Sequence, residues 1–315
     1  MKDETLRLLF VDDEERIVSL LRTIFRQNYE VHTATSGAEA LQIISKMHIH
    51  VIVSDQRMPG MLGIDLLSRV RQLSPNTMRV LLTGYSDLAA IVGSVNDGEV
   101  FRYINKPWDH TEIKEIIAQA AEIARTTAYA PVLVPHETVA VKSPMMASAA
   151  SLLVIDDNVD VINSISGMFQ NVYGVHGARN IAQAIEILEQ HDISVIITDT
   201  HVNNEDTTQL LRILKTQYPL ILAILLTEAQ DAEMVIKLIN QVQIFRYANK
   251  PIRRGALQLS VKAAINQNVI YKNNPALLAR LAVQVTPETA QTSSLRISIM
   301  NGLRALRGRF AFMRE

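Results

Sequence analysis

The sequence contains one seven-residue pattern twice, Phe-Arg-Tyr-x-Asn-Lys-Pro, at positions 101–107 and again at 245–251. The two copies lie 144 residues apart, and the flanking sequence aligns at the same offset without a gap. For example, "LLFVDDEERI" at 8–17 aligns with "LLVIDDNVDV" at 152–161. An ungapped repeat of this length predicts two copies of one domain, which suits a chain of 315 residues.

Within each repeat, short apolar runs alternate with amphipathic segments. The apolar runs have the length of strands and end in Asp or Thr, as in "VIVSD" at 51–55 and "RVLLT" at 79–83. The segments between them place apolar residues at helical spacing, for example at Ile17, Leu20, Leu21 and Ile24. Strands that alternate with helices predict a doubly wound α/β fold, in which helices cover both faces of a five-stranded parallel sheet.

The repeat also predicts the domain organisation. We expect a first α/β domain at 1–125 and a second at 149–272. Residues 126–148 contain three prolines and no helical period, which predicts a linker. Residues 273–315 have no counterpart in the first half, and their apolar residues recur at helical spacing beside several arginines. We expect a helical tail that either packs on the second domain or is exposed as a dimer helix, a kinase-docking helix or a membrane-surface helix.

Composition excludes several classes of function. With 31 basic and 32 acidic residues, the chain has no basic footprint for nucleic acid. It has no cysteine, and therefore no disulfide and no thiolate metal ligand. Its apolar runs are far shorter than the ~20 residues of a membrane helix, and the N-terminus lacks the pattern of a signal peptide. We expect a cytoplasmic protein without a transmembrane segment or a nucleic-acid partner.

Polar residues stand where the predicted strands of the first repeat end. They are Asp12 and Asp13, then Asp55, then Thr83, and finally Lys106. Ligands of an open parallel sheet bind at the carboxyl ends of its strands, so these residues should meet at one edge. Three carboxylates in one crevice repel each other and need a cation, and oxygen ligands favour Mg²⁺. A lysine and a threonine opposite them suit a phosphoryl group carried by one carboxylate.

Each of these features has a simpler interpretation when it is taken alone. An Asp-Asp pair before a helix is usually a helix N-cap, and a Lys-Pro pair is usually a turn. The joint occurrence of the whole set, twice and in register, favours a functional site instead.

The ordered set of Asp-Asp, Asp, Thr and Lys-Pro resembles the CheY-like receiver domain of two-component response regulators, over nearly all of 5–125 and 150–272. The resemblance implies that Asp55 accepts a phosphoryl group from a phosphohistidine. It implies that Lys106 pairs with a phosphoryl oxygen and that its bond to Pro107 is cis. It also implies that Thr83 and Tyr103 move when the phosphoryl group arrives.

The resemblance further implies a Mg²⁺ site formed by the carboxylates of Asp12, Asp13 and Asp55 and the backbone carbonyl of Arg57. The second repeat holds a counterpart of every residue of the set. These counterparts are the acidic pair, the acceptor, the threonine, the Lys-Pro pair, the tyrosine and the residue that offers its backbone carbonyl: Asp156, Asp157, Asp199, Thr227, Lys250, Pro251, Tyr247 and His201.

The second repeat departs from the first at two places beside this set. Met-Pro-Gly at 58–60 becomes Val-Asn-Asn at 202–204, which predicts a loop of different shape after the acceptor. Gly84 becomes Glu228, which adds bulk and negative charge next to the incoming phosphoryl group. We therefore expect Asp199 to be a slower acceptor than Asp55, or one that depends on a specific donor.

These features predict a tandem-receiver response regulator of a two-component phosphorelay, with a sensor histidine kinase or a His-phosphotransfer protein as donor. It would signal through phosphorylation-dependent protein contacts, and the surfaces at 87–125 and 231–272 are the expected contact faces. Two alternatives remain open: a phosphate sink or relay intermediate, and a scaffold that binds partners without phosphorylation. We expect no enzymatic output, because the sequence lacks a Ser or His nucleophile set, a phosphate-cradling Gly-rich loop and a zinc motif.

Overall fold

In the computed structural model the chain forms two five-stranded parallel sheets, one in each of two units. The structure describes residues 5–84, 100–127, 150–228, 238–240, 242–275 and 277–278. Nearly all of the predicted linker and of the predicted helical tail lie outside the described residues, as do parts of both predicted contact faces. Among the helices that the structure describes, none combines the length and the apolar composition of a membrane span.

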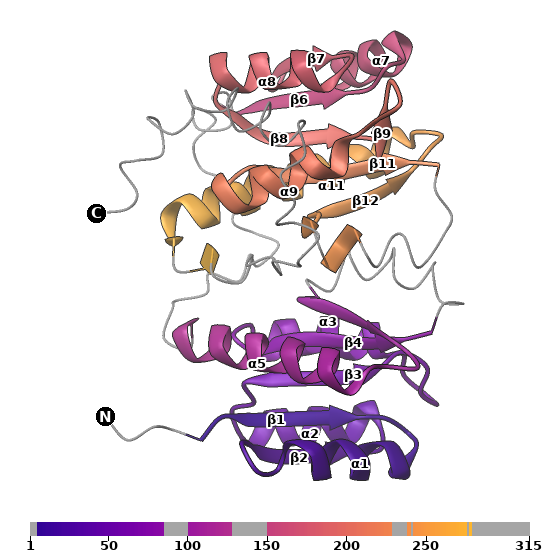
Figure 1. Ribbon diagram of the computed structural model, residues 1–315, viewed down its shortest axis with the longest axis vertical. Coiled ribbons are helices and arrows are strands. Elements are labelled where there is room, and N and C mark those ends of the chain that lie inside the picture. The colour runs from indigo at the N-terminus through magenta and orange to yellow at the C-terminus, as the bar shows by residue number, and fades with distance from the viewer. Residues whose placement is uncertain are drawn as a thin grey trace. The chain divides into compact units, whose positions relative to one another are not determined.

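The first unit alternates strands and helices along the chain. Its elements are β1 (Arg7–Val11), α1 (Glu15–Phe25), β2 (Glu30–Ala34), α2 (Gly37–Lys46), β3 (Val51–Asp55), α3 (Gly63–Leu73), β4 (Met78–Thr83), β5 (Arg102–Asn105) and α5 (His110–Thr127). The strands run parallel in the order β2-β1-β3-β4-β5 (Figure 1). The order reverses direction between β1 and β3, and this is where doubly wound sheets bind their ligands.

The second unit has the same topology, with one addition. Its elements are β6 (Ser151–Ile155), α7 (Val159–Phe169), β7 (Gly174–Ala178), α8 (Ile181–Gln190), β8 (Ile193–Thr198), β9 (His201–Val202), β10 (Glu205–Asp206), α9 (Thr207–Gln217), β11 (Leu222–Thr227), β12 (Arg246–Asn249) and α11 (Arg254–Asn273). The main sheet has the order β7-β6-β8-β11-β12, and β9 and β10 form a separate antiparallel pair. That hairpin has no equivalent among the described elements of the first unit.

The sheet of the first unit is buried on both faces, which explains the continuous apolar runs in its strands. Alternate residues of the central strands, such as Leu8 and Phe10, join one cluster with Phe25 of α1 and with Ile113 and Ile117 of α5. On the other face α2 and α3 pack against each other. Four of the five β1 side chains are almost completely buried. The packing of β1 therefore fixes the position of its carboxyl end.

Local capping signals place the helices that surround this end. Ser36 accepts a hydrogen bond from the Glu39 backbone N–H, while the Glu39 carboxylate accepts one from the Thr35 N–H. This reciprocal arrangement is a capping box and fixes the beginning of α2. In the second unit Asn180 accepts from the Gln183 N–H at the beginning of α8. The same repeat position therefore carries a capping side chain in both units.

Candidate functional site

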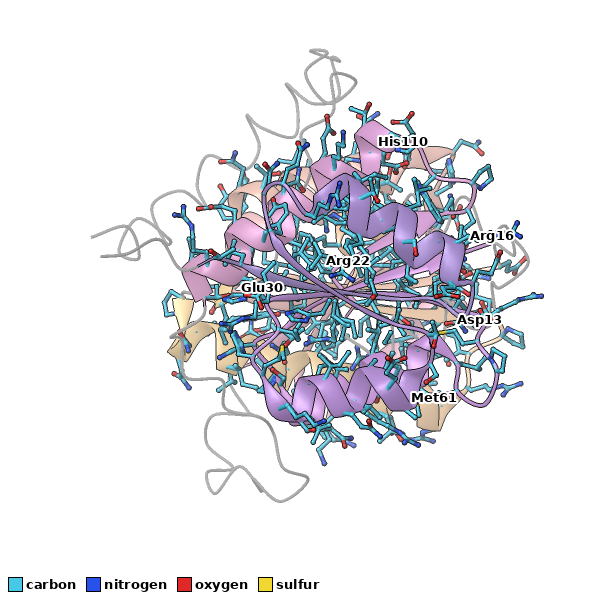
Figure 2. The ribbon with its side chains drawn as sticks, turned by 90° about the horizontal axis from the view of Figure 1, so that it is seen from below. Asp13, Arg16, Arg22, Glu30, Met61 and His110 are labelled. Atoms are coloured by element: carbon cyan, nitrogen blue, oxygen red, sulfur yellow. The ribbon has the colours of Figure 1, made fainter. Side chains whose placement is uncertain are left out.

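The carboxyl ends of β1 and β3 bring three carboxylates together in the first unit. Carboxylate oxygens of Asp12, Asp13 and Asp55 all lie within 4.8 Å of one another. Asp12 and Asp13 directly follow β1, and Asp55 is the last residue of the neighbouring β3. In Figure 2, Asp13 lies at the same end of the unit as Met61 in the loop after β3, away from Glu30 at the start of β2. The predicted convergence of these strand ends is therefore present.

A lysine from the edge strand completes the cluster. The Lys106 Nζ lies 2.8 Å from Asp12 Oδ2 and 2.6 Å from Asp55 Oδ1. Lys106 follows β5, whose register with β4 carries it to this edge of the sheet, and the Lys106–Pro107 peptide bond is cis, as the resemblance implied. Asp12 and Asp55 are buried, with exposed fractions of 1% and 6%, so this ion pair is poorly screened by water.

The two carboxylate oxygens of Asp12 bind different partners. Oδ2 binds Lys106, while Oδ1 accepts a hydrogen bond of 2.9 Å from the Glu14 backbone N–H. The second bond shapes the turn into α1, where the N-terminal residue of the helix has no side-chain cap of its own. Asp12 therefore shapes this turn with one oxygen and pairs with Lys106 through the other, but it is not the side-chain cap of α1.

The charges of this cluster do not cancel. Three carboxylates face one ammonium group, which leaves two negative charges without a counter-charge when all are ionised. Burial raises the pKa of the Asp55 carboxyl above its usual range, and the charge of Asp12 adds to the rise, while Lys106 opposes it. Burial alone would lower the pKa of Lys106, but its hydrogen bonds to Asp12 and Asp55 outweigh this and raise the pKa. A divalent cation with oxygen ligands would neutralise the excess charge, so the residues present fit Mg²⁺.

Of the other predicted residues of the first site, Arg57 and Thr83 lie beside the acceptor and Tyr103 lies one strand farther away. The Arg57 backbone N–H donates to Asp55 Oδ2 at 3.0 Å, which places the Arg57 backbone beside the cluster. Thr83 ends β4 and is fully buried, and its hydroxyl donates to the Gly84 carbonyl at 3.3 Å. Tyr103 on the adjacent β5 is also buried.

Trp108 also lies beside the first site, although no pattern in the sequence predicted it there. The Lys106 Nζ lies 5.8 Å from the centroid of the Trp108 ring, within the range of a cation–π contact. Trp108 is the only tryptophan of the chain, and the second repeat has Ile252 at this position. That difference between the two repeats was visible in the sequence and marks Trp108 as a reporter specific to the first site.

The second unit reproduces the central ion pair. The Lys250 Nζ lies 2.9 Å from Asp156 Oδ2 and 2.8 Å from Asp199 Oδ2, and the Lys250–Pro251 bond is cis. Asp156 Oδ1 accepts from the Asn158 N–H, as Asp12 does from Glu14. Thr227 ends β11, and Tyr247 lies buried on the neighbouring β12.

The electrostatics of the second acceptor differ from those of the first. Burial would raise the pKa of Asp199, but hydrogen bonds from Lys250, Thr227 and the Thr200 backbone outweigh it and lower the pKa. Asp199 Oδ1 accepts from the Thr200 backbone N–H at 2.6 Å and from the Thr200 hydroxyl at 3.2 Å. The Asp199 carboxylate is therefore already stabilised by donors from the protein itself.

The predicted metal ligands of the second unit come together only in part. Among the residues that the structure describes, the Asp12–Asp13–Asp55 group alone brings three potential ligand side chains this close. Asp157 Oδ2 accepts a 2.9 Å hydrogen bond from the Asn203 backbone N–H instead. Asn203 is at the tip of the β9–β10 hairpin, in the segment where the sequence predicted a different loop, and His201 lies in β9. The second cluster therefore does not offer the same metal-binding geometry.

Comparison with known proteins agrees with this geometry. The family model described as the response regulator receiver domain matches residues 8–118 and 152–262. The hydrogenase transcriptional regulatory protein HoxA of Cupriavidus necator is 35% identical over 122 residues, which are 39% of this chain and 25% of that protein. The sporulation initiation phosphotransferase F of Bacillus subtilis is 31% identical over 112 residues, 35% of this chain and 90% of that protein.

Among solved structures, the signal receiver domain of an HD domain-containing protein from Pseudomonas fluorescens Pf-5 is 33% identical, with a TM-score of 0.39. The match covers 41% of this chain and 95% of the Pseudomonas receiver domain. The aligned regions span about a quarter of the length of the transcriptional regulators that the chain matches. Because the family model covers most of both repeats, the chain belongs to the response regulator receiver family and carries two receiver domains in tandem.

Proposed function

We propose that the first receiver accepts a phosphoryl group on Asp55 from a phosphohistidine of a sensor histidine kinase or a His-phosphotransfer protein. The observation that carries the proposal is the bridge from Lys106 Nζ to Asp55 Oδ1, 2.6 Å long, beside carboxylate oxygens within 4.8 Å of one another. A receiver domain implies a kinase or a phosphotransfer partner in general. This geometry points to the residue that takes the group.

The proposed step is an in-line displacement at phosphorus. A carboxylate oxygen of Asp55 forms the new P–O bond while the P–N bond to the donor imidazole breaks, and the released imidazole nitrogen takes up a proton from water. Mg²⁺, when bound by Asp12, Asp13, Asp55 and the Arg57 carbonyl, supplies positive charge to the phosphoryl oxygens. Lys106 is already held at this edge of the sheet by Asp12, so it is positioned to pair with a phosphoryl oxygen without a large movement.

The output of this step is a change of surface rather than a released product. The phosphoryl group adds a charge of about −1.5 to −2, which can bias a two-state element. Thr83 lies on β4, which pairs with the strand of the acceptor, and Tyr103 lies on β5, which pairs with β4. We propose that these two residues carry the change to a protein partner. The chain would have no enzymatic output of its own. Because histidine kinases use ATP, we place the exchange in the cytoplasm.

The second receiver holds the same residue types, but Asp199 also accepts from the Thr200 hydroxyl, and Asp157 accepts from the Asn203 N–H. Glu228, directly after Thr227, is exposed and would add negative charge near an incoming phosphoryl group. We therefore propose that Asp55 carries the exchange and that Asp199 is at most a slow acceptor.

Phosphorylation with acetyl phosphate and Mg²⁺, resolved on a phosphate-affinity gel, tests the proposal. Wild type and Asp199→Asn should give a slow-migrating band that Asp55→Asn loses. Asp65→Asn removes an exposed carboxylate of α3 and serves as the matched control, which should keep the band. A band that persists in Asp55→Asn would contradict the assignment.

The same samples separate the switch from the two alternatives. A long-lived band with a change in oligomer size, measured by light scattering, supports a switch. A rapidly decaying band without a change in size favours a phosphate sink or relay intermediate. No band in any variant favours a scaffold that binds partners without phosphorylation.

A further inference from the structure

The loops after the two acceptors differ in shape, and one repeat position beside them differs in the size of its side chain. In the first receiver this position is Gly63, where an added Cβ would lie 2.0 Å from the Asp55 carbonyl oxygen. In the second receiver it is Thr207, which carries a Cβ, although the backbone N–H of this position donates to the equivalent carbonyl in both receivers, Gln56 in the first and Thr200 in the second. The Thr207 hydroxyl also donates to the carbonyls of Asp199 and Thr200.

The segment before Thr207 forms the β9–β10 hairpin of the second receiver. Its two tip residues, Asn203 and Asn204, have φ values of 54° and 63°. Asn tolerates this left-handed region better than most residues, and two such residues in sequence are typical of a two-residue hairpin turn. The first receiver has Pro59 and Gly60 at these positions, and Gly60 alone has a positive φ, of 79°.

The hairpin is fixed to the helices on both of its sides. The Glu205 carboxylate accepts from the backbone N–H of Ile181 at the beginning of α8, at 3.2 Å. Asp206 accepts from the Thr208 N–H and so caps α9, at 2.9 Å. In the first receiver the positions of Glu205 and Ile181 hold Met61 and Gly37, which are in van der Waals proximity and exchange no such bond.

The third attachment of the hairpin is to the acidic pair. The Asn203 N–H donates to Asp157 Oδ2 at 2.9 Å, in the place where Asp13 of the first receiver contributes to the carboxylate group. At Asp199, Thr200 and Lys250 occupy Oδ1 and Oδ2. The Asn203 N–H and the Thr200 hydroxyl thus add donors to the acidic cluster of the second receiver, beyond the lysine and backbone donors that both acceptors have.

We infer that the hairpin takes the place of the metal in the second receiver, which therefore binds no divalent cation and keeps one conformation whether or not Mg²⁺ is present. Together with the site proposed for the first receiver, this gives one divalent cation per chain. The tandem chain then combines a receiver that responds to Mg²⁺ and phosphoryl donors with one that presents a fixed surface. The absence of a metal from the second receiver is inferred from the hairpin contacts. The combination of a fixed receiver with a switching one rests in addition on the function proposed for Asp55.

Titration of the full chain with Mg²⁺ in a calorimeter tests this inference by counting sites. Wild type should bind one Mg²⁺ per chain. Asp13→Asn should lose at least ten-fold in affinity, and Asp157→Asn, its counterpart in the second receiver, should match wild type. Two sites in wild type, or loss of the single site in Asp157→Asn, would overturn the inference.

A gain-of-function variant tests the cause. The triple substitution Asn203→Pro, Asn204→Gly and Thr207→Gly introduces the residues of the first receiver. Proline removes the N–H that binds Asp157 and cannot adopt a φ of 54°, and glycine removes the Cβ and the hydroxyl of Thr207. The variant should bind a second Mg²⁺, provided that circular dichroism shows a folded chain. A folded variant that still binds one Mg²⁺ would refute the role of the hairpin.

Asp157→Asn leaves the hairpin sequence intact, so the site count in that variant decides the matter even if the triple variant does not fold. No Mg²⁺ binding by wild type would contradict the function proposed for the first receiver, yet would agree with a metal-free second receiver. The two proposals therefore fail on different results.

Discussion

Replacing Gly63 with alanine should damage the first site through the backbone alone. The new Cβ would lie 2.0 Å from the Asp55 carbonyl oxygen, and such contacts are not tolerated below 3.0 Å. The backbone of Asp55 or of α3 must therefore move by at least about 1 Å, a displacement that can cost on the order of 100-fold in rate when it misplaces a reacting group. Crowding of this kind typically costs about 1–3 kcal/mol of stability.

Two assays measure these effects. The rate of Asp55 labelling by acetyl phosphate with Mg²⁺ should fall by about 100-fold in Gly63→Ala. Guanidinium unfolding followed by the fluorescence of Trp108, which reports on the first receiver alone, should show a loss of about 1–3 kcal/mol. Gly255→Ala in α11 is the matched control, because no atom outside its neighbours lies within 4 Å of the new Cβ. It should leave labelling unchanged and leave the second receiver as stable or slightly more stable.

Wild-type labelling and stability in Gly63→Ala would refute the reasoning. That result would mean that the close approach of α3 to the Asp55 backbone is not what positions the acceptor.

Three further predictions concern charge. Lys106→Met leaves the buried Asp12 and Asp55 carboxylates without their cation. Unfolding measured by circular dichroism without Mg²⁺ should therefore show a loss of about 2–4 kcal/mol, somewhat less than the ~3–5 kcal/mol of a fully buried pair because Lys106 is 27% exposed. An unchanged midpoint would contradict this. Burial and the nearby His191 lower the pKa of His176, so the neutral ring is favoured in the folded state and the second receiver should lose stability as the pH falls below about 6.5. In His191→Gln an NMR titration should find the His176 pKa closer to its usual value, and an unchanged pKa would rule out the effect of His191. Glu228→Gly removes the charge beside Thr227 but leaves the hairpin intact. In an Asp55→Asn background, a phosphate-affinity gel of this variant should therefore show no rapid labelling of Asp199. Rapid labelling would mean that Glu228, and not the hairpin, limits the second site.

Much of the fold and of the first site could be predicted from the repeat itself. The apolar runs set the strands, and the alternation with helices set the parallel sheets, because a doubly wound sheet leaves few other arrangements. Asp12, Asp55 and Lys106 could be placed together because carboxyl ends of neighbouring parallel strands share one edge.

The difference between the two sites was only half predicted. The change from Met-Pro-Gly at 58–60 to Val-Asn-Asn at 202–204 indicated a different loop, but not that an Asn203 N–H would bind Asp157. The change from Gly63 to Thr207 was visible in the same alignment. Its structural effect could not be predicted, because it depends on the distance of 2.0 Å between an added Cβ at Gly63 and the Asp55 carbonyl oxygen. The contact between Lys106 and Trp108 depends in the same way on how one loop folds.

The fluorescence of Trp108 gives the most direct test of the central claim, because its ring lies beside Lys106 in the first site. Mg²⁺ should change the emission in a saturable way, and beryllofluoride, which mimics a phosphoryl group on a carboxylate, should change it further only when Mg²⁺ is present. Asp55→Asn should abolish the response to beryllofluoride. A response that persists in Asp55→Asn, or that needs no Mg²⁺, would show that the acidic cluster and Lys106 do not form a metal-dependent phosphoacceptor site.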